Sequence, residues 1–272
     1  MAEPLRSPTS TVGKDQDHPG KCPGDKETLT TKKREEAQAE RNRRWEMAYA
    51  PRIREIIPGL CLGNVKASHR QTMLEESRIN AIVSLTDARW VWWNSTTRKA
   101  GIPEHRHKWV QCVDSSTQDL LVYMSDICDF IDQMASPVLR ESTTFLVESE
   151  RERDSEPVLS DTPRDPDRPE AIMIHCDLGI SRSPTVIIAY LMRKYDMKRE
   201  DVQAFVHTKQ KVKPSANLTR QLQVWEQVGY QVWEDEERTV PKAPYQAFLD
   251  DRAALLKKKG LTGNEPLAPL NL

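Results

Sequence analysis

One short stretch of the 272-residue chain gathers side chains that could do nucleophilic chemistry on a phosphate ester. It runs from His175 to Pro184 with the sequence HCDLGISRSP, between an apolar run and an apolar segment with helical spacing. Backbone N–H groups in a loop that leads into a helix can converge on one anion, and the helix dipole adds to the attraction. Gly179 permits the turn, and Arg182 offers a planar fork of donors for two phosphate oxygens. The positive potential of such a loop favours a nucleophilic thiolate at Cys176, so the stretch indicates a phosphoryl-transfer site.

The alternative interpretation of this stretch is a buried structural cysteine beside an exposed arginine, and its strand–loop–helix context argues against that. Further strands and helices are predicted around the loop from the spacing of apolar residues. The predicted strands cover 54–57, 60–62, 81–85, 108–113 and 171–174, and the predicted helices cover 68–76, 119–134, 183–195, 199–208 and 217–228. Ser68 is expected to cap the first helix. Strands that alternate with helices indicate an α/β fold, with a central, mostly parallel sheet flanked by helices.

Composition indicates how much of the chain this fold occupies. Lys and Arg number 40 against 41 Asp and Glu, a net charge of −1 that argues against a dedicated nucleic-acid binder. Hydrophobic residues make up 38%, below the ~45–50% of a typical globular domain, so part of the chain is expected to be disordered. We expect a charged, disordered N-terminal extension at 1–50 and one catalytic domain at 51–234. A disordered charged insertion is expected at 141–170, and a C-terminal extension with one helix at 235–272.

Several classes of protein are disfavoured by the sequence. No secretory signal is visible, and the longest apolar run, Val186 to Met192, is far too short to span a bilayer. Five scattered cysteines without Cys-x-x-Cys spacing match neither a disulfide framework nor a zinc site. We therefore expect a reducing compartment, the cytoplasm or the nucleus, and no membrane insertion. The basic clusters at 32–34 and 41–44 suit a solvated charged helix better than a nuclear-import signal.

The motif His-Cys-x-x-Gly-x-x-Arg-Ser at 175–183 resembles the signature of cysteine-based protein phosphatases, and GISRSP is most similar to the dual-specificity branch. The segment IIPGLCLGN at 56–64, the helical segment at 119–132, and Lys213-Pro214 with Gln221-Leu222 resemble the same family. The resemblance covers about residues 53–230, with 141–170 as an extra segment. It implies a protein-tyrosine-phosphatase-like fold of the dual-specificity type. The first 50 residues are too polar to form an appended docking domain.

The resemblance also implies a role for each residue of the loop. Cys176 would be the nucleophile, and the hydroxyl of Ser183 would assist the later departure of its sulfur. Phosphate oxygens would be held by the Arg182 side chain and by the backbone N–H groups of Asp177, Leu178, Gly179, Ile180, Ser181 and Arg182. His175 would orient the loop from behind rather than act as a base. No cofactor and no metal is expected.

The family's general acid lies on a separate loop, which Val113-Asp114 matches here. Asp114 would protonate the leaving oxygen, which otherwise departs as an alkoxide or phenoxide. Asp119 is the competing candidate, and we favour it as the N-cap of the following helix.

Other patterns have ordinary structural explanations that we favour. His105 and His107 could mimic a metal pair but lack a third ligand. Cys112 could form a redox disulfide with Cys176, but a buried structural thiol fits it better. The tryptophans at 90, 92 and 93 could line a substrate entrance or pack into the core, and Thr162 before a proline could be a phosphorylation site.

The implied activity is metal-independent hydrolysis of phosphotyrosine and phosphoserine or phosphothreonine in proteins, so the expected partner is a phosphoprotein. Two alternatives remain open: a phosphatase of lipid, sugar or nucleotide phosphates, and a non-catalytic phospho-binding adaptor. Asp177 and the absence of lysine from the loop disfavour a highly anionic small substrate. The oligomeric state stays open. Ser215 stands where the family often has asparagine, which puts a local structural bond in doubt.

Overall fold

The computed structural model describes residues 24–87, 95–143 and 169–263. Contacts divide the chain into two units, residues 1–47 and residues 48–272. Most of helix α1 (Gly24–Tyr49) belongs to the first unit, and its described side chains between Arg34 and Met47 are exposed. The predicted N-terminal extension therefore contains a long, solvated helix without an apolar face.

The second unit alternates strands with helices from its first strand onward. In chain order the elements are β1 (Ile53–Ile57), β2 (Leu60–Asn64), α2 (Val65–Ser68), α3 (Gln71–Glu76), β3 (Ile79–Thr86), α4 (Ser95–Lys99), the 3₁₀ turn η2 (Glu104–Arg106), β4 (His107–Gln111), α5 (Leu121–Met134), α6 (Pro137–Glu141), β5 (Ala171–Cys176), α8 (Arg182–Tyr195), α9 (Arg199–Lys209), α10 (Ala216–Gln227) and α11 (Ala243–Lys259).

These strands form one five-stranded sheet in the order β1-β2-β5-β3-β4. Only the hairpin pair β1–β2 is antiparallel, and β2–β5, β5–β3 and β3–β4 are parallel. The predicted α/β fold with a mostly parallel sheet is confirmed. Strand β5 is the middle strand. The loop after its last residue lies at the carboxyl edge of the sheet, where α/β folds bind ligands.

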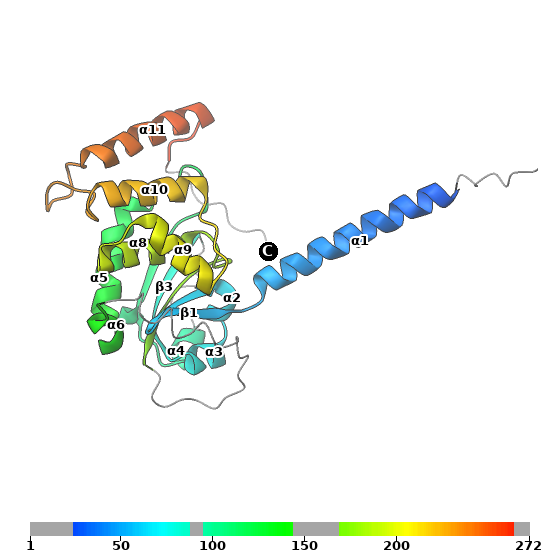
Figure 1. The fold of residues 1–272 in the computed structure, drawn as a ribbon, viewed down its shortest axis with the longest axis horizontal. Coiled ribbons are helices and arrows are strands. Elements are labelled where there is room, and N and C mark those ends of the chain that lie inside the picture. Colours follow the sequence, from blue (N-terminus) through cyan, green and yellow to red (C-terminus); the bar gives the residue numbers. More distant parts are fainter. Residues whose placement is uncertain (1–23, 88–94, 144–168, 264–272) are drawn as a thin grey trace, which may run out of the picture. The chain divides into compact units, whose positions relative to one another are not determined.

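Strand β5 is buried on both faces, as expected for a central parallel strand. Its alternate residues Ile172, Ile174 and Cys176 join the larger core, whereas Ala171 and Met173 join a smaller one on the opposite face. Figure 1 shows α8 and α10 on one side of the sheet and α3 and α4 on the other. Cys176 therefore ends β5 on the face that carries the larger core.

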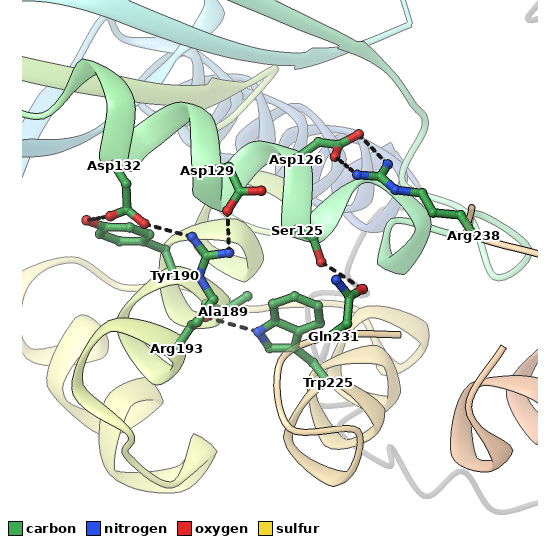
Figure 2. Close-up of polar contacts among 10 residues, drawn as sticks. All are labelled: Ser125, Asp126, Asp129, Asp132, Ala189, Tyr190, Arg193, Trp225, Gln231 and Arg238. Atoms are coloured by element: carbon green, nitrogen blue, oxygen red, sulfur yellow. Dashed lines mark hydrogen bonds and ion pairs between the residues drawn. The ribbon is translucent and has the colours of Figure 1, made fainter. Parts of the chain in front are cut away.

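Helix α5 packs its apolar stripe into the larger core and carries a row of carboxylates on its other side. Figure 2 shows the partners of these carboxylates. Arg193 of α8 bonds to Asp129 and Asp132, both at 2.7 Å. Arg238, which follows α10, pairs with Asp126. The segment between α10 and α11 is thereby tied to α5.

Two expectations need correction or qualification. The single helix predicted at 68–76 is two short helices, and Ser68 ends α2, donating its hydroxyl to the Val65 carbonyl, instead of capping a helix. Most of the predicted insertion at 141–170 and the tail after residue 263 lie outside the described residues. The domain boundaries at residues 51 and 234 stay predictions. In the described part of the chain, no helix is long and apolar enough to cross a membrane.

Candidate active site

The loop from Cys176 to Arg182 joins the end of β5 to the first residue of α8, as the sequence predicts. Gly179 has a φ of +67°, and a Cβ on it would lie 2.5 Å from the carbonyl oxygen of Gly63 in β2. Both the left-handed backbone and the close approach of β2 exclude a side chain here. The motif therefore requires glycine at this position partly because of β2, which lies outside the loop.

The surrounding protein binds the carbonyl oxygens of this loop one after another. The oxygen of Asp177 accepts from the N–H of Val65 at 3.3 Å. The oxygen of Leu178 accepts from Arg52, that of Gly179 from Gln210 Nε2 at 3.0 Å, and that of Ile180 from the N–H of Lys213 at 2.8 Å. In a trans peptide the C=O and the next N–H point in opposite directions. The N–H groups of residues 178–181 consequently face away from these partners, as an anion-binding loop requires.

Cys176 is 2% exposed and sits at the base of this loop. The buried hydroxyl of Ser183 donates to its Sγ at 3.2 Å. A hydroxyl donor stabilises negative charge on sulfur. The Ser183 hydroxyl therefore lies where it could assist the departure of the Cys176 sulfur, as predicted.

Arg182 is fixed by three hydrogen bonds. Nη1 donates to the carbonyl oxygens of Leu85 at 3.1 Å and Cys112 at 2.9 Å, and Nη2 lies 2.5 Å from Oδ2 of Asp177. Burial works against the charge, but the neighbouring Cys176, Asp177 and Cys112 outweigh it and raise the pKa of Arg182 above its usual value. The guanidinium therefore stays charged and points in one direction.

A cavity of about 440 Å³ opens over the loop. Asp114 lines it together with Cys176 and Arg182, although it follows a different strand, β4. The predicted nucleophile, the predicted phosphate-binding arginine and the predicted general acid therefore line one cavity.

Asp119 has a structural role at the start of α5, but the N-cap of this helix is Leu120, so the predicted capping position is one residue too early. Its Oδ1 accepts from the N–H of Leu121, the first residue of α5, at 2.9 Å, and its Oδ2 accepts from the hydroxyl of Tyr245 at 2.8 Å. Burial raises the pKa of Asp119 above its usual value, although these two bonds oppose the increase. Among these carboxylates, Asp114 lines the cavity and Asp119 stabilises the start of a helix.

His175 points to the face of the sheet opposite Cys176. The hydroxyl of Ser84 bridges it to a second histidine, at 2.6 Å from His175 Nε2 and 2.7 Å from His107 Nε2. Burial lowers the pKa of His175 to about 3, with a further contribution from His107, and burial lowers the pKa of His107 to about 4. Both rings are neutral at physiological pH, so they order the end of β5 by hydrogen bonding. His107 is engaged here and is not half of a metal pair.

Comparison with known proteins agrees with this geometry. Residues 166–228 match the family described as "Dual specificity phosphatase, catalytic domain". The tyrosine-protein phosphatase yvh1 of Schizosaccharomyces pombe is 27% identical over 132 residues, which cover 48% of this chain and 31% of that protein. Dual specificity protein phosphatase 1 of Arabidopsis thaliana is 29% identical over 171 residues, which cover 62% of this chain and 66% of that protein.

The chain is similar to the dual-specificity phosphatase family, whose catalytic-domain description it matches over residues 166–228. It spans less than two thirds of the length of either curated relative. The phosphatase domain of Yvh1 from Chaetomium thermophilum, a solved structure, is 24% identical, with a TM-score of 0.46 over 66% of this chain and 96% of that one.

Several residues of this candidate site have positions that the sequence did not predict. Tyr49 and Lys213 line the cavity, and Arg52 bonds to the loop. Lys213 follows a helix and was noted only for its resemblance to the family, whereas no local pattern marks Tyr49 or Arg52. At the position where the family often has asparagine, the N–H of Ser215 donates to Ser181 Oγ at 3.1 Å. The 210–215 segment therefore still supports the loop.

The remaining residues that the sequence analysis considered lie away from the loop or outside the described residues. Cys112 is buried and a free thiol, in agreement with the structural role favoured for it, and burial raises its pKa to about 12. Trp90, Trp92, Trp93 and Thr162 lie outside the described residues. The catalytic and phosphate-binding roles of the loop residues stay predictions.

Proposed function

We propose that this chain is a protein phosphatase that hydrolyses phosphotyrosine and phosphoserine or phosphothreonine through a cysteinyl-phosphate intermediate. The observation that carries the proposal is the shared cavity of Cys176, Arg182 and Asp114, with the Ser183 hydroxyl on the nucleophilic sulfur. Similarity to the dual-specificity family supports the same reaction class. A reducing compartment, the cytoplasm or the nucleus, suits a mechanism that needs a free thiolate.

In the first step, the Sγ of Cys176 attacks phosphorus and forms an S–P bond while the P–O bond to the leaving group breaks. Asp114 delivers its proton to the departing oxygen. The transferring group spreads negative charge over three equatorial oxygens. The loop N–H groups are oriented before substrate arrives, so they stabilise this charge with little reorganisation, and Arg182 adds its positive charge.

In the second step, water attacks phosphorus and the S–P bond breaks, which releases inorganic phosphate. Asp114, now a carboxylate, accepts the proton from the attacking water. The Ser183 hydroxyl, 3.2 Å from the sulfur, donates to the departing thiolate. Cys176 and Asp114 therefore take part in both displacements.

The test is hydrolysis of 4-nitrophenyl phosphate in the presence of EDTA. Cys176→Ser should lower kcat/KM by at least about 10³-fold, because the nucleophile is removed. Cys128→Ala is the matched control, since Cys128 is a buried thiol of α5 that takes no part in the proposed reaction. An active Cys176→Ser enzyme would refute the assignment.

Substrate class is decided by a panel of phosphopeptides, phosphoinositides, sugar phosphates and nucleotides. We expect kcat/KM to be highest for the phosphopeptides, because the described lining of the cavity contains one arginine and one lysine, too few cations for a highly anionic small substrate. Faster turnover of a lipid, sugar or nucleotide phosphate would replace the proposed substrate. Tight phosphopeptide binding without turnover by the wild type would indicate an adaptor.

A further inference from the structure

Helix α11 lies beyond the part of the chain that matches the family, which ends at residue 228. It is nevertheless integrated into the larger core, where Tyr245 is 1% and Phe248 3% exposed. The Trp233 ring meets the Tyr245 ring edge-on, with centroids 5.5 Å apart. Figure 2 shows the second anchor, the pair between Arg238 and Asp126 of α5. The helix therefore packs against α10, and the segment before it is tied to α5.

One face of α11 bonds to the loop that follows Asp114. The Tyr245 hydroxyl donates to Asp119 Oδ2 at 2.8 Å, Arg252 Nε to the Thr117 carbonyl at 2.7 Å, and Lys259 Nζ to Ser116 Oγ at 2.7 Å. Tyr245, Arg252 and Lys259 are seven residues apart, about two helical turns, which places them on one side of the helix. The contacts thus form a row along the loop.

Helix α10 completes the support of this loop. Asn217 Nδ2 donates to the carbonyl oxygen of Ser115 at 2.9 Å, directly after Asp114. On the other side of Asp114, the carbonyl oxygen of Cys112 accepts from Arg182 at 2.9 Å. The loop is therefore bonded on both sides of Asp114, and much of the support on its far side comes from α11.

We propose that α11 is a positioning element for Asp114, with Tyr245 and Arg252 as positioning residues that hold the carboxyl at the leaving-group oxygen. The inference rests on the proposed function, because it assigns a task within that reaction. A proton donor must come within about 2.6–3.2 Å of the atom it protonates. Loops move more than the elements they join, and a displacement of 1 Å can cost ~10²-fold in rate. Fixing the loop from an additional helix therefore protects proton transfer specifically.

The experiment measures kcat/KM of the 272-residue chain and its variants for two aryl phosphates. Phenyl phosphate releases a weakly acidic phenol and needs the proton, whereas 2,4-dinitrophenyl phosphate releases a stable phenolate and does not. Arg252→Ala should lower kcat/KM for phenyl phosphate about 10-fold and for the dinitrophenyl ester less than about 2-fold. Arg252→Lys should restore part of the loss, and Tyr245→Phe should act in the same direction with little change in shape.

Lys258→Ala is the matched control, because Lys258 is an exposed neighbour on α11 outside this row of contacts. Asp114→Asn removes the acid completely. The ratio of its losses of kcat/KM on the two substrates is therefore the largest that loss of proton transfer can produce. Thermal unfolding midpoints of all variants report whether the fold is kept.

Equal losses on both substrates in Arg252→Ala and Tyr245→Phe would mean a general structural role and would overturn the inference. Unchanged rates in both variants would overturn it as well. Either result leaves the proposed function standing, provided that the wild type is active and depends on Cys176. A wild type that hydrolyses neither ester, or an active Cys176→Ser enzyme, would overturn both.

Discussion

The guanidinium of Arg182 is paired with a carboxylate of its own loop, since its Nη2 lies 2.5 Å from Oδ2 of Asp177. The Arg182 side chain is 7% exposed and the Asp177 side chain 41%, so the pair sits at the wall of the cavity. A phosphate that enters this cavity competes with Asp177 for the same donor and meets a like charge. Asp177 therefore shapes which phosphate esters the site accepts.

Replacing Asp177 with asparagine should strengthen anion binding. We expect Asp177→Asn to lower KM for 4-nitrophenyl phosphate, and the inhibition constant of vanadate, by roughly 3- to 10-fold, because a partly exposed charge is screened by water. Steady-state kinetics at low and high salt measure both constants, and the difference should shrink at high salt. Asp201→Asn, on exposed Asp201 of α9, is the control for net charge. A higher KM in Asp177→Asn would mean that the carboxylate organises the loop instead.

Gly179→Ala should be far more harmful than the same change at another left-handed glycine. At Gly179 the new Cβ would lie 2.5 Å from the Gly63 oxygen, whereas at Gly229, with φ +64°, it would meet nothing within 4 Å. We expect the free energy of unfolding to fall by about 2–4 kcal/mol for Gly179→Ala and by about 1 kcal/mol for Gly229→Ala. Urea unfolding measures both values, and equal losses would show that the contact with β2 has no effect.

The two buried histidines should make stability fall in mild acid. Burial lowers the pKa of His175 to about 3 and that of His107 to about 4, while an unfolded chain titrates near 6.5. Between about pH 6.5 and pH 4 the unfolded state therefore binds more protons, and the free energy of unfolding decreases as the pH falls. The loss at pH 5 is at most about 2 kcal/mol per histidine.

The measurement is urea unfolding between pH 5 and 7.5. His107→Asn should flatten the dependence on pH relative to wild type, because one titrating group is removed. His105→Asn, which alters an exposed histidine near the same strand, should leave the slope unchanged. A wild-type stability that stays constant over this range would contradict the prediction.

The candidate site could be located from the sequence because most of it is local. Cys176, Arg182 and Ser183 lie within eight residues, between an apolar strand and an apolar helix, so residue type, spacing and secondary structure together indicate the anion-binding loop. The bond of Asp119 to the start of α5 is also local, since its partner is the N–H two residues later, although the N-cap itself is Leu120. The parallel sheet followed from the alternation of strands and helices, although the division of one predicted helix into α2 and α3 did not.

The supports of the site were decided by the tertiary structure. Ser84 lies 91 residues from His175, its partner across the sheet, and Arg52 lies 126 residues from the Leu178 carbonyl that it binds. A helix within the C-terminal extension at 235–272 was predicted from the sequence, but its row of contacts with residues 116–119 depends on how α11 packs against α10. A short motif specifies which atoms react because its residues are neighbours in the chain. Where those atoms are held depends on contacts between distant segments, which exist only once the core has formed.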